Sequence, residues 1–289
     1  MKNISDAVSL PVARQYLNIL GIRTAIYQTP NFEKEHSKEA VILLHGGAPG
    51  VSAELCWFKN FHALQRAGYR VLAFDQPGFG FSSPPENHSI DFRYQHFTEL
   101  LIALNLKEAH LCGSSIGGLL CSLYALSNPR TGPKAISLIL SAPYPYFEPP
   151  AIAQEQLIEH RARLSSVEPT YESIRALCEN TFNQKSQVTD EIIAHRLSML
   201  EGDRWDAYQA RKSISRKFDK KGTAGLHVNT PTLIVWGVED RSLPYEIGIE
   251  AMKWFSHGRF LFLTQCGHWP QTEQAHTFNQ EMLDFLRSA

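Results

Sequence analysis

Long hydrophobic runs and a surplus of charge of either sign are both missing from this chain of 289 residues. The longest aliphatic runs, such as residues 40–44, are far too short to span a bilayer, and residues 1–15 lack the apolar stretch of a signal peptide. The 28 lysines and arginines nearly balance the 29 aspartates and glutamates, and these charges are scattered. Without a basic stripe, nucleic acid and membrane are not expected as partners.

The cysteine and histidine patterns that hold disulfides or metals are missing as well. The five cysteines are odd in number, widely spread and free of any CxxC pair, which argues against a disulfide framework and a zinc site. The twelve histidines include no HExxH motif and no clustered ligand spacing. We therefore expect no metal, no cofactor and a reducing compartment, the cytoplasm.

What is present is an ordinary globular composition, 43% hydrophobic and 20% charged, at a length that suits one large α/β domain. Short β-branched runs alternate with longer stretches of helical spacing. This alternation predicts an α/β fold with a mostly parallel sheet and helices on both faces. The expected strands are 16–28 (two strands turning near Gly21), 40–45, 69–75, 109–113, 135–141, 232–236 and 259–263. The expected helices are 54–67, 91–105, 115–127, 244–255 and one from 272.

The alternation is interrupted at residues 143–150, PYPYFEPP, whose four prolines cannot continue a strand or enter a helix interior. No strand-like run follows until Asn229, and three segments there have helical spacing: 151–164, 170–182 and 189–201. We interpret residues 143–229 as a helical lid inserted between two strands, over an active site. Residues 1–142 and 230–289 then form the core.

The sharpest motif is Gly113-Ser114-Ser115-Ile116-Gly117, which comes directly after a predicted strand and directly before a predicted helix. In that context a tight turn lifts a serine hydroxyl above the sheet edge, and flanking glycines leave room for it. The N-terminus of the following helix favours negative charge that develops there. The alternative is that Ser115 simply caps the helix, but the strand–turn–helix placement favours a nucleophile.

A serine nucleophile needs a base, and the base needs an orienting carboxylate. In one common order these residues follow as Ser, then Asp or Glu, then His, each after a strand. Asp240 follows the strand expected at 232–236, and His268 follows the one at 259–263. Glu239 is a rival acid, and Asp75, at the end of an earlier strand, is a weaker one. We therefore predict a catalytic triad of Ser115, His268 and Asp240.

The tetrahedral intermediate of acyl transfer needs hydrogen-bond donors aimed at its oxyanion. The string HGGAPG at 45–50 follows a predicted strand, the position where such a fold supplies one donor. We assign the N–H groups of Gly47 and Ile116 as the oxyanion hole. The alternative is a plain glycine turn. His45 is expected to be structural rather than a catalytic base.

Together these residues resemble the α/β-hydrolase family over essentially the whole chain. Several strings are similar to the meta-cleavage product hydrolases, which cleave carbon–carbon bonds in ring-opened aromatic compounds. They are HGGAPG, DQPGFG at 75–80, the acid loop at 237–244, the C-terminal DFLR and, most tellingly, CGHW at 266–269. The resemblance implies that Trp269 lines the substrate pocket and that Gly46 and Ser114 also belong to the substrate-binding residues.

Arg196 falls in the middle of an apolar arc on the helix expected at 189–201. A charge there must be paired or face a polar cavity, because desolvating it alone is very costly. Periodicity equally allows an arginine that extends to the surface or pairs with a nearby glutamate. The resemblance implies instead that this lid arginine reaches into the cleft and contacts the carboxylate-bearing dienol end of the substrate.

Two positions depart from the pattern of the resembled family. Ser114 stands where an asparagine usually precedes the nucleophile, and Cys56 replaces a second asparagine after the glycine-rich loop, unless a local insertion displaces it. Both asparagines belong to the recognition of the dienoate in that family. The departures therefore concern the substrate more than the triad.

The sequence leaves three functions open. The first is a carbon–carbon bond hydrolase acting on an anionic 2-hydroxy-6-oxo-dienoate with an apolar substituent. The second keeps the same machinery for an ester, as a carboxylesterase, thioesterase or lactonase, and the third is a hydrolase-like binding protein. Ser115 disfavours the aspartate-nucleophile dehalogenases and epoxide hydrolases. A homodimer stays open. Six aromatic residues expected near the pocket suggest the apolar substituent: Trp57, Phe79, Phe81, Tyr144, Tyr146 and Phe147.

Overall fold

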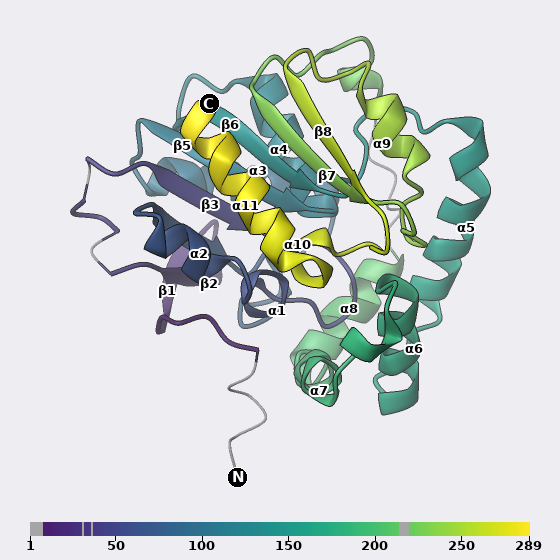
Figure 1. Ribbon diagram of the computed structural model, residues 1–289. Coiled ribbons are helices and arrows are strands. Elements are labelled where there is room, and N and C mark those ends of the chain that lie inside the picture. The colour runs from purple at the N-terminus through teal and green to yellow at the C-terminus, as the bar shows by residue number, and fades with distance from the viewer. Residues whose placement is uncertain (1–7, 31, 36, 214–219) are drawn as a thin grey trace.

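A computed structural model describes residues 8–30, 32–35, 37–213 and 220–289. Its centre is an eight-stranded sheet in the order β1-β2-β4-β3-β5-β6-β7-β8 (Figure 1). The pairs β1–β2 and β2–β4 are antiparallel, and the other pairs are parallel. The strands are β1 (Arg14–Ile19), β2 (Ile22–Gln28), β3 (Ala40–Leu44), β4 (Arg70–Phe74), β5 (Glu108–Ser114), β6 (Lys134–Ser141), β7 (Thr232–Gly237) and β8 (Gly258–Leu263).

Most helices alternate with these strands. They are α1 (Ala53–Trp57), α2 (Phe61–Arg66), α3 (Ile90–Ala103), α4 (Ile116–Ser127), α9 (Glu246–Ala251), α10 (Pro270–Glu273) and α11 (Ala275–Ser288). Four further helices lie between β6 and β7, namely α5 (Ala151–Ser165), α6 (Tyr171–Thr181), α7 (Asp190–Ser198) and α8 (Asp203–Ser213). Two short 3-10 turns, Lys185–Gln187 and Lys220–Thr223, complete this segment.

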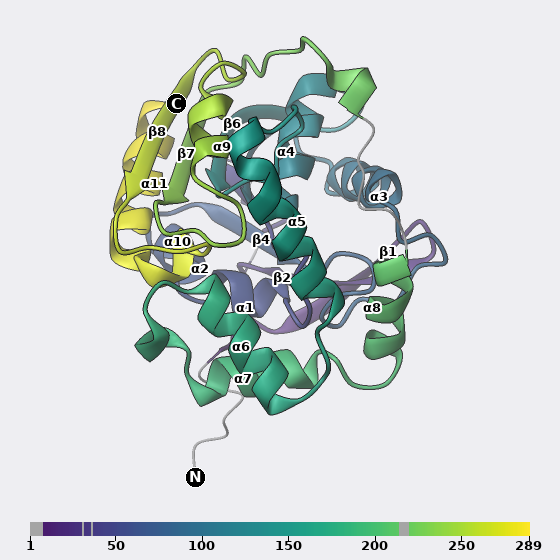
Figure 2. The same ribbon diagram turned by 90° about the vertical axis from the view of Figure 1, so that its right-hand side faces the viewer.

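Each face of the sheet has its own apolar core, because alternate residues of a strand point to opposite faces. Val41 and Leu43 of β3 pack in the cluster shared with α1, α2 and α11, whereas Ile42 and Leu44 pack in the cluster shared with α3 and α4. Both views show α11 on one side of the sheet and α3 and α4 on the other (Figures 1 and 2). With both faces covered, β3 is a continuous apolar run.

This architecture confirms the expected fold class, and every expected strand is present. The prediction of one helix at 54–67 is wrong, because the segment forms two helices, α1 and α2, with a break at residues 58–60. At this break the Asn60 amide donates to the Gln271 carbonyl at 2.9 Å and to Asn279 Oδ1 at 2.8 Å. Helix α8 was not expected from the sequence. None of the described helices combines the length and the apolar character needed to cross a bilayer.

The helices between β6 and β7 pack onto the core rather than standing apart from it. Helices α6 and α7 lie side by side below the sheet in both views, and α8, which follows them in the chain, stands apart from them in Figure 2 (Figures 1 and 2). Their buried side chains, including Ile174, Ile193 and Tyr208, join the apolar cluster of α1 and α2. A polar contact of 2.8 Å between His195 Nε2 of α7 and Ser52 Oγ, the N-cap of α1, adds to this packing.

Candidate active site

A cavity lies at the carboxyl ends of the parallel strands, where open α/β sheets bind their ligands. One side is lined by residues that follow β3, β5, β6, β7 and β8, namely Gly46, Gly47, Ser115, Ile116, Tyr144, Ser242, Leu243, His268 and Trp269. The opposite side includes His160, Arg161 and Leu164 of α5 and Leu177 and Thr181 of α6. The sequence-predicted nucleophile, base and oxyanion loop therefore share one cavity.

Ser115 stands in a strained turn between β5 and α4. Its φ of 52° is in the left-handed region, which costs a non-glycine residue roughly 1–3 kcal/mol. The turn is tight because a Cβ on Gly113 would lie 2.5 Å from the Gly117 carbonyl carbon, and one on Gly117 would lie 2.5 Å from the Leu44 oxygen. These two glycines let the chain turn sharply enough to expose the Ser115 side chain to the cavity.

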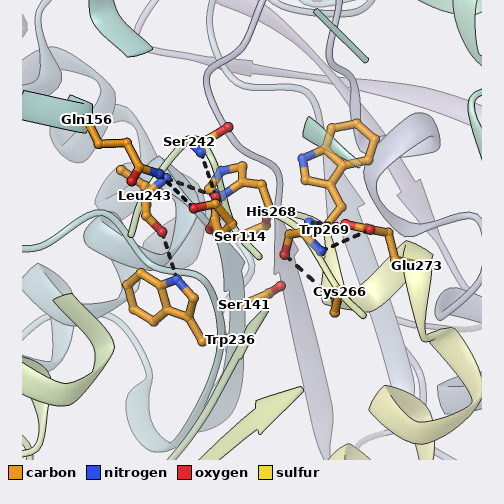
Figure 3. A network of polar contacts seen from close by, with 12 residues as sticks. Ser114, Ser141, Gln156, Trp236, Ser242, Leu243, Cys266, His268, Trp269 and Glu273 are labelled. Atoms are coloured by element: carbon orange, nitrogen blue, oxygen red, sulfur yellow. Dashed lines mark hydrogen bonds and ion pairs between the residues drawn. The ribbon is translucent and has the colours of Figure 1, made fainter. Parts of the chain in front are cut away.

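The His268 side chain is held by the carboxylate of Asp240. Nδ1 of His268 donates to Asp240 Oδ2 at 2.7 Å, and the other carboxylate oxygen accepts the backbone N–H groups of Ser242 and Leu243 at 2.8 and 2.9 Å. These bonds fix the carboxylate, which in turn fixes the tautomer with its proton on Nδ1. Figure 3 shows His268 beside Ser242 and Leu243. The second ring nitrogen is then an acceptor that can take a proton.

Asp240 is the acid that contacts His268, and the two alternatives from the sequence, Glu239 and Asp75, do not. Glu239 instead accepts the backbone N–H of Cys266 at 3.1 Å. Asp75 is fully buried, accepts two backbone N–H groups near α1 and β4, and burial raises its pKa to about 7. Ser115 and His268 face the same cavity without a direct hydrogen bond between their described side chains. Such contacts often tighten only when substrate binds.

The glycine-rich loop closes against the nucleophile turn. A Cβ placed on Gly46 would lie 3.3 Å from Ser115 Cβ, and one on Gly47 would lie 3.2 Å from Ile116 Cγ1. Ile116 is the first residue of α4, so its backbone N–H is one of those that a helix leaves without an internal partner. Both predicted oxyanion donors therefore come from backbone that lines the cavity beside Ser115.

His45 supports this loop from below. Its Nδ1 donates to the Gly46 carbonyl at 2.7 Å, and its Nε2 accepts the backbone N–H of Gln76 at 2.9 Å. Burial lowers the pKa of His45 to about 3, so the ring stays neutral and keeps both bonds. His45 is not among the residues that line the cavity, which agrees with a structural role.

Trp269 lines the cavity, but Arg196 lies behind it. The Arg196 side chain is 0% exposed, its Nη1 donates to the Pro49 carbonyl at 3.0 Å, and its guanidinium lies 4.8 Å from the centre of the Trp269 ring. Nε and Nη2 have no hydrogen-bond partner among the described residues. The alternative in which Arg196 extends to the surface is therefore wrong, and in this arrangement its guanidinium does not reach the cavity.

Ser114 and Cys56, the two departures from the family pattern, also lie outside the lining of the cavity. Both face the amide of Gln271, which donates to Ser114 Oγ at 3.4 Å and to Cys56 Sγ at 3.6 Å. The side-chain oxygen of Gln271, Oε1, accepts from Ser141 Oγ at 2.6 Å. A buried polar cluster thus lies behind the nucleophile where the family's two asparagines are missing.

Sequence reasoning missed Glu273, whose buried carboxylate holds the histidine loop. Its Oε1 accepts the backbone N–H of Trp269 at 3.0 Å, and its Oε2 accepts those of Gly267 at 3.0 Å and Asn183 at 2.7 Å. Figure 3 shows this carboxylate directed at the chain beside His268. No sequence signal pointed to it, because a glutamate in a short helix looks like a solvated residue.

The lining of the cavity is also more basic than the sequence indicated. Arg93 of α3, Arg161 of α5 and Arg211 of α8 all line it, whereas Tyr144 alone of the six expected aromatic residues does so. The helices that carry two of these arginines lie between β6 and β7, and their placement over the site cannot be read from periodicity. Among the described residues, no group of three or more His, Cys, Asp or Glu side chains is placed to hold a metal ion.

Comparisons with known proteins identify the family of this chain. The alpha/beta hydrolase fold family matches residues 39–275. A 2-hydroxy-6-oxononadienedioate/2-hydroxy-6-oxononatrienedioate hydrolase of Paraburkholderia phymatum is 30% identical over 278 residues, 94% of this chain and 95% of its own. The 2-hydroxy-6-oxo-6-phenylhexa-2,4-dienoate hydrolase of Comamonas testosteroni is 30% identical over 271 residues, 86% of this chain and 88% of its own.

A solved structure gives the same result at the level of the fold. The meta-cleavage product hydrolase CumD of Pseudomonas fluorescens IP01 is 25% identical and superposes with a TM-score of 0.80, over 95% of this chain and 97% of that one. The chain therefore belongs to the α/β-hydrolase family and is a hydrolase of its meta-cleavage product group.

Proposed function

We propose that this hydrolase cleaves a carbon–carbon bond in a ring-opened aromatic compound of the 2-hydroxy-6-oxo-dienoate type. Ser115 is the nucleophile, His268 its base and Asp240 the group that orients the base. The observation that carries the proposal is the 2.7 Å bond between His268 and Asp240 on the cavity that Ser115 also lines. The names of the relatives, which are hydrolases of such dienoates, support the choice of substrate.

The reaction combines one ketonisation with two nucleophilic attacks, the first by Ser115 and the second by water. The dienol is first ketonised, so that the proton of the 2-hydroxyl group is lost and carbon 5 gains one, with Arg196 and His268 assisting. Ser115 Oγ then attacks the ketone at carbon 6 and gives its proton to His268, while the N–H groups of Gly47 and Ile116 hold the oxyanion.

The bond between carbons 5 and 6 breaks next, and its electron pair moves into the conjugated keto acid. His268 returns the proton to the leaving fragment, and water, activated by the same imidazole, releases the acyl group from Ser115 as a carboxylic acid. An ester would need the attack by Ser115, the loss of its leaving group and the release by water, but no ketonisation, so the ketonisation step is what distinguishes the two reactions.

Arg196 is the group we propose for the carboxylate end of the dienoate. A wholly buried guanidinium with two unpartnered donor nitrogens is costly, and a carboxylate would accept a charge-assisted bond from each of them. The Trp269 indole must move aside for the carboxylate to reach them, because this ring, and not the guanidinium, lines the cavity. Gly46, which lines the cavity, belongs to the same end of the proposed site, and Ser114 lies behind it against the Gln271 amide. The remaining carbon chain of the proposed substrate then lies against apolar side chains of the cavity, such as those of Leu164 and Leu243.

The test compares ring-opened dienoates with neutral aryl esters. Wild-type protein should favour the dienoates, and Ser115→Ala should abolish turnover of both classes. Arg196→Gln should lower kcat/KM for dienoates by an amount that corresponds to roughly 2–4 kcal/mol of lost transition-state stabilisation, the scale for removing one partner of a buried charged pair. Ester hydrolysis should change far less. Equal losses on both classes would indicate misfolding around α7, and no loss on dienoates would exclude Arg196 from the site.

Two broader features belong to the same proposal. Five unpaired, buried thiols suit a reducing compartment, so we propose the cytoplasm as the setting. We propose a homodimer as the assembly, to be tested by light scattering.

A further inference from the structure

Two polar side chains of the cavity have no part in the proposed triad, namely Ser242 in the loop after β7 and His160 on α5. Ser242 is 1% exposed, and its Oγ has no hydrogen-bond partner among the described residues. Leaving a buried hydroxyl unbonded is costly. Because Ser242 lines the cavity, a molecule bound in the cavity can supply that partner.

The loop that carries Ser242 is bound to the same carboxylate as the base. The backbone N–H of Ser242 donates to Asp240 Oδ1 at 2.8 Å, while Oδ2 accepts from His268 Nδ1 at 2.7 Å. Figure 3 shows Ser242 beside His268. One carboxylate therefore places the Ser242 hydroxyl and the imidazole on the same part of the cavity wall.

Helix α5 brings His160 to this part of the wall. Gln156 Nε2 donates to the Asp240 carbonyl at 2.8 Å, which attaches α5 to the acid loop. His160 lies one turn further along the helix, on the same face as Gln156. Its ring centre lies 6.4 Å from that of His268, and the two ring planes are inclined at 53°.

The separation of the two imidazoles suits a bridging water molecule. With ring centres 6.4 Å apart, the nitrogens of the two rings stay beyond hydrogen-bond distance even when they face each other. Polar groups at such a separation are commonly joined by a water, which is held well only where several polar partners meet. His268 Nε2, the His160 ring and Ser242 Oγ are three such partners, and they come from three segments of the chain.

The other hydroxyls of the lining, apart from the nucleophile, already have protein partners. Thr181 Oγ1 donates to the Leu177 carbonyl at 2.8 Å, Ser89 Oγ accepts the backbone N–H of Phe92 at 3.1 Å, and the Tyr144 hydroxyl accepts from an arginine at 2.6 Å. Among the described residues of the lining there is no aspartate or glutamate. Ser242 is therefore the hydroxyl of this wall that is placed to bind a small polar guest beside the base.

We propose that Ser242 Oγ and the His160 ring hold the water that hydrolyses the acyl-enzyme. The water oxygen attacks the acyl carbon while His268 Nε2 takes one of its protons, and the other proton stays with the new acid. The bond from that carbon to Ser115 Oγ then breaks, and His268 returns the proton to Ser115 Oγ. A carboxylic acid and the free serine result.

This inference rests on the proposed function through Ser115 and His268, and it is independent of the dienoate. Acylation does not use the water, because its nucleophile is Ser115 itself. Loss of a group that holds the water should therefore slow the second half of the reaction and leave the first half nearly unchanged. A disturbed bond between Asp240 and His268 would slow both halves, because His268 is the base in each.

The experiment measures the two halves separately with p-nitrophenyl butyrate. Stopped-flow release of p-nitrophenol gives the rate constant for acylation, and quenched-flow mass spectrometry of the butyryl adduct on Ser115 gives that for deacylation. Ser242→Ala should lower the deacylation rate constant roughly 3- to 10-fold, the scale of one neutral hydrogen bond, and should change acylation far less. More of the adduct should then accumulate in the steady state.

Variants of His160 and an outside serine complete the set. His160→Phe should also slow deacylation selectively, and His160→Gln, which keeps a donor and an acceptor, should retain part of the wild-type rate. Ser256→Ala, at an exposed position before β8, is the matched control and should keep both wild-type rate constants.

The outcomes separate this inference from the assignment of the nucleophile. An unchanged deacylation rate constant in both Ser242→Ala and His160→Phe overturns the water site, even if the Ser115 adduct forms normally. Slower acylation with unchanged deacylation also overturns it, because it assigns the hydroxyl to the substrate instead. If the wild-type protein forms no adduct on Ser115, the proposed nucleophile fails and the water site fails with it.

Discussion

Glu273 connects the loop that carries His268 with the segment that follows α6, and Glu273→Gln should weaken the hydrogen bonds to both. Its carboxylate accepts the backbone N–H groups of Gly267 and Trp269, which flank His268, and that of Asn183, which follows α6. An amide of the same shape offers one oxygen and one NH2 group. Whichever way the amide turns, at least one of the three N–H donors will face another donor.

The size of the effect follows from the number and kind of bonds. A hydrogen bond to a charged group contributes about 1.5–3 kcal/mol, and a buried donor left without an acceptor costs about 1–3 kcal/mol. Glu273 is 8% exposed, so water replaces little of what is lost. One bond removed and two weakened to neutral strength should lower the free energy of unfolding by about 2–4 kcal/mol.

Catalysis should suffer as well, because the loop carries the base. We expect kcat to fall by about tenfold or more, since a misdirected imidazole mainly affects the steps after substrate binding, and KM to change less. Urea unfolding and steady-state kinetics measure the two effects. Glu155→Gln, an exposed position on α5, is the control. A Glu273→Gln protein with the wild-type urea midpoint and the wild-type kcat would refute the reasoning.

The strands and the positions of the residues proposed as catalytic could be predicted because their signals are local. A fully buried parallel strand is a short apolar run, and the residues that bind ligands directly follow such runs. Ser115 in its glycine turn, Asp240 after β7 and His268 after β8 all fit this rule. The structure then brings Asp240 to His268 at 2.7 Å, a choice over Glu239 that the sequence alone left open.

Features that depend on distant partners could not be predicted. The break between α1 and α2 occurs next to Asn60, whose amide has its partners 211 and 219 residues further along the chain. Helix α8 carries too few apolar residues in regular spacing to show a buried face.

The two arginines of the site illustrate the same limit. Periodicity correctly put Arg196 on the buried face of its helix, but not behind the Trp269 ring. Arg161 lies between exposed and partly exposed positions of α5, so nothing in the pattern distinguishes a cavity residue from a solvated one. Only the packing of α5 over the strand ends places it beside Tyr144.

Three further predictions concern the acid, metals and pH. Asp240→Asn should lower kcat by several orders of magnitude, whereas Glu239→Gln should have a small effect; the reverse would move the acid by one residue. Dialysis against a strong chelator should leave kcat unchanged, and a loss restored by zinc or manganese would contradict this. For pH, burial lowers the pKa of His45 to about 3 and those of His96 and His195 to about 4, from an ordinary 6.5. The unfolded chain therefore binds these three protons at a higher pH than the folded chain does. Their contribution to the free energy of unfolding is fully present above pH 6.5 and falls as the pH drops towards 4, by up to about 1.4 kcal/mol per histidine per pH unit, whereas Asp75, whose pKa burial raises to about 7, changes stability in the opposite direction. Urea midpoints measured between pH 7.5 and 4.5 give the slope of stability against pH, and His195→Gln, which removes one of these groups, should lose less stability over this range than the wild-type protein does. An unchanged slope in that variant would show that His195 is not held neutral in the folded protein.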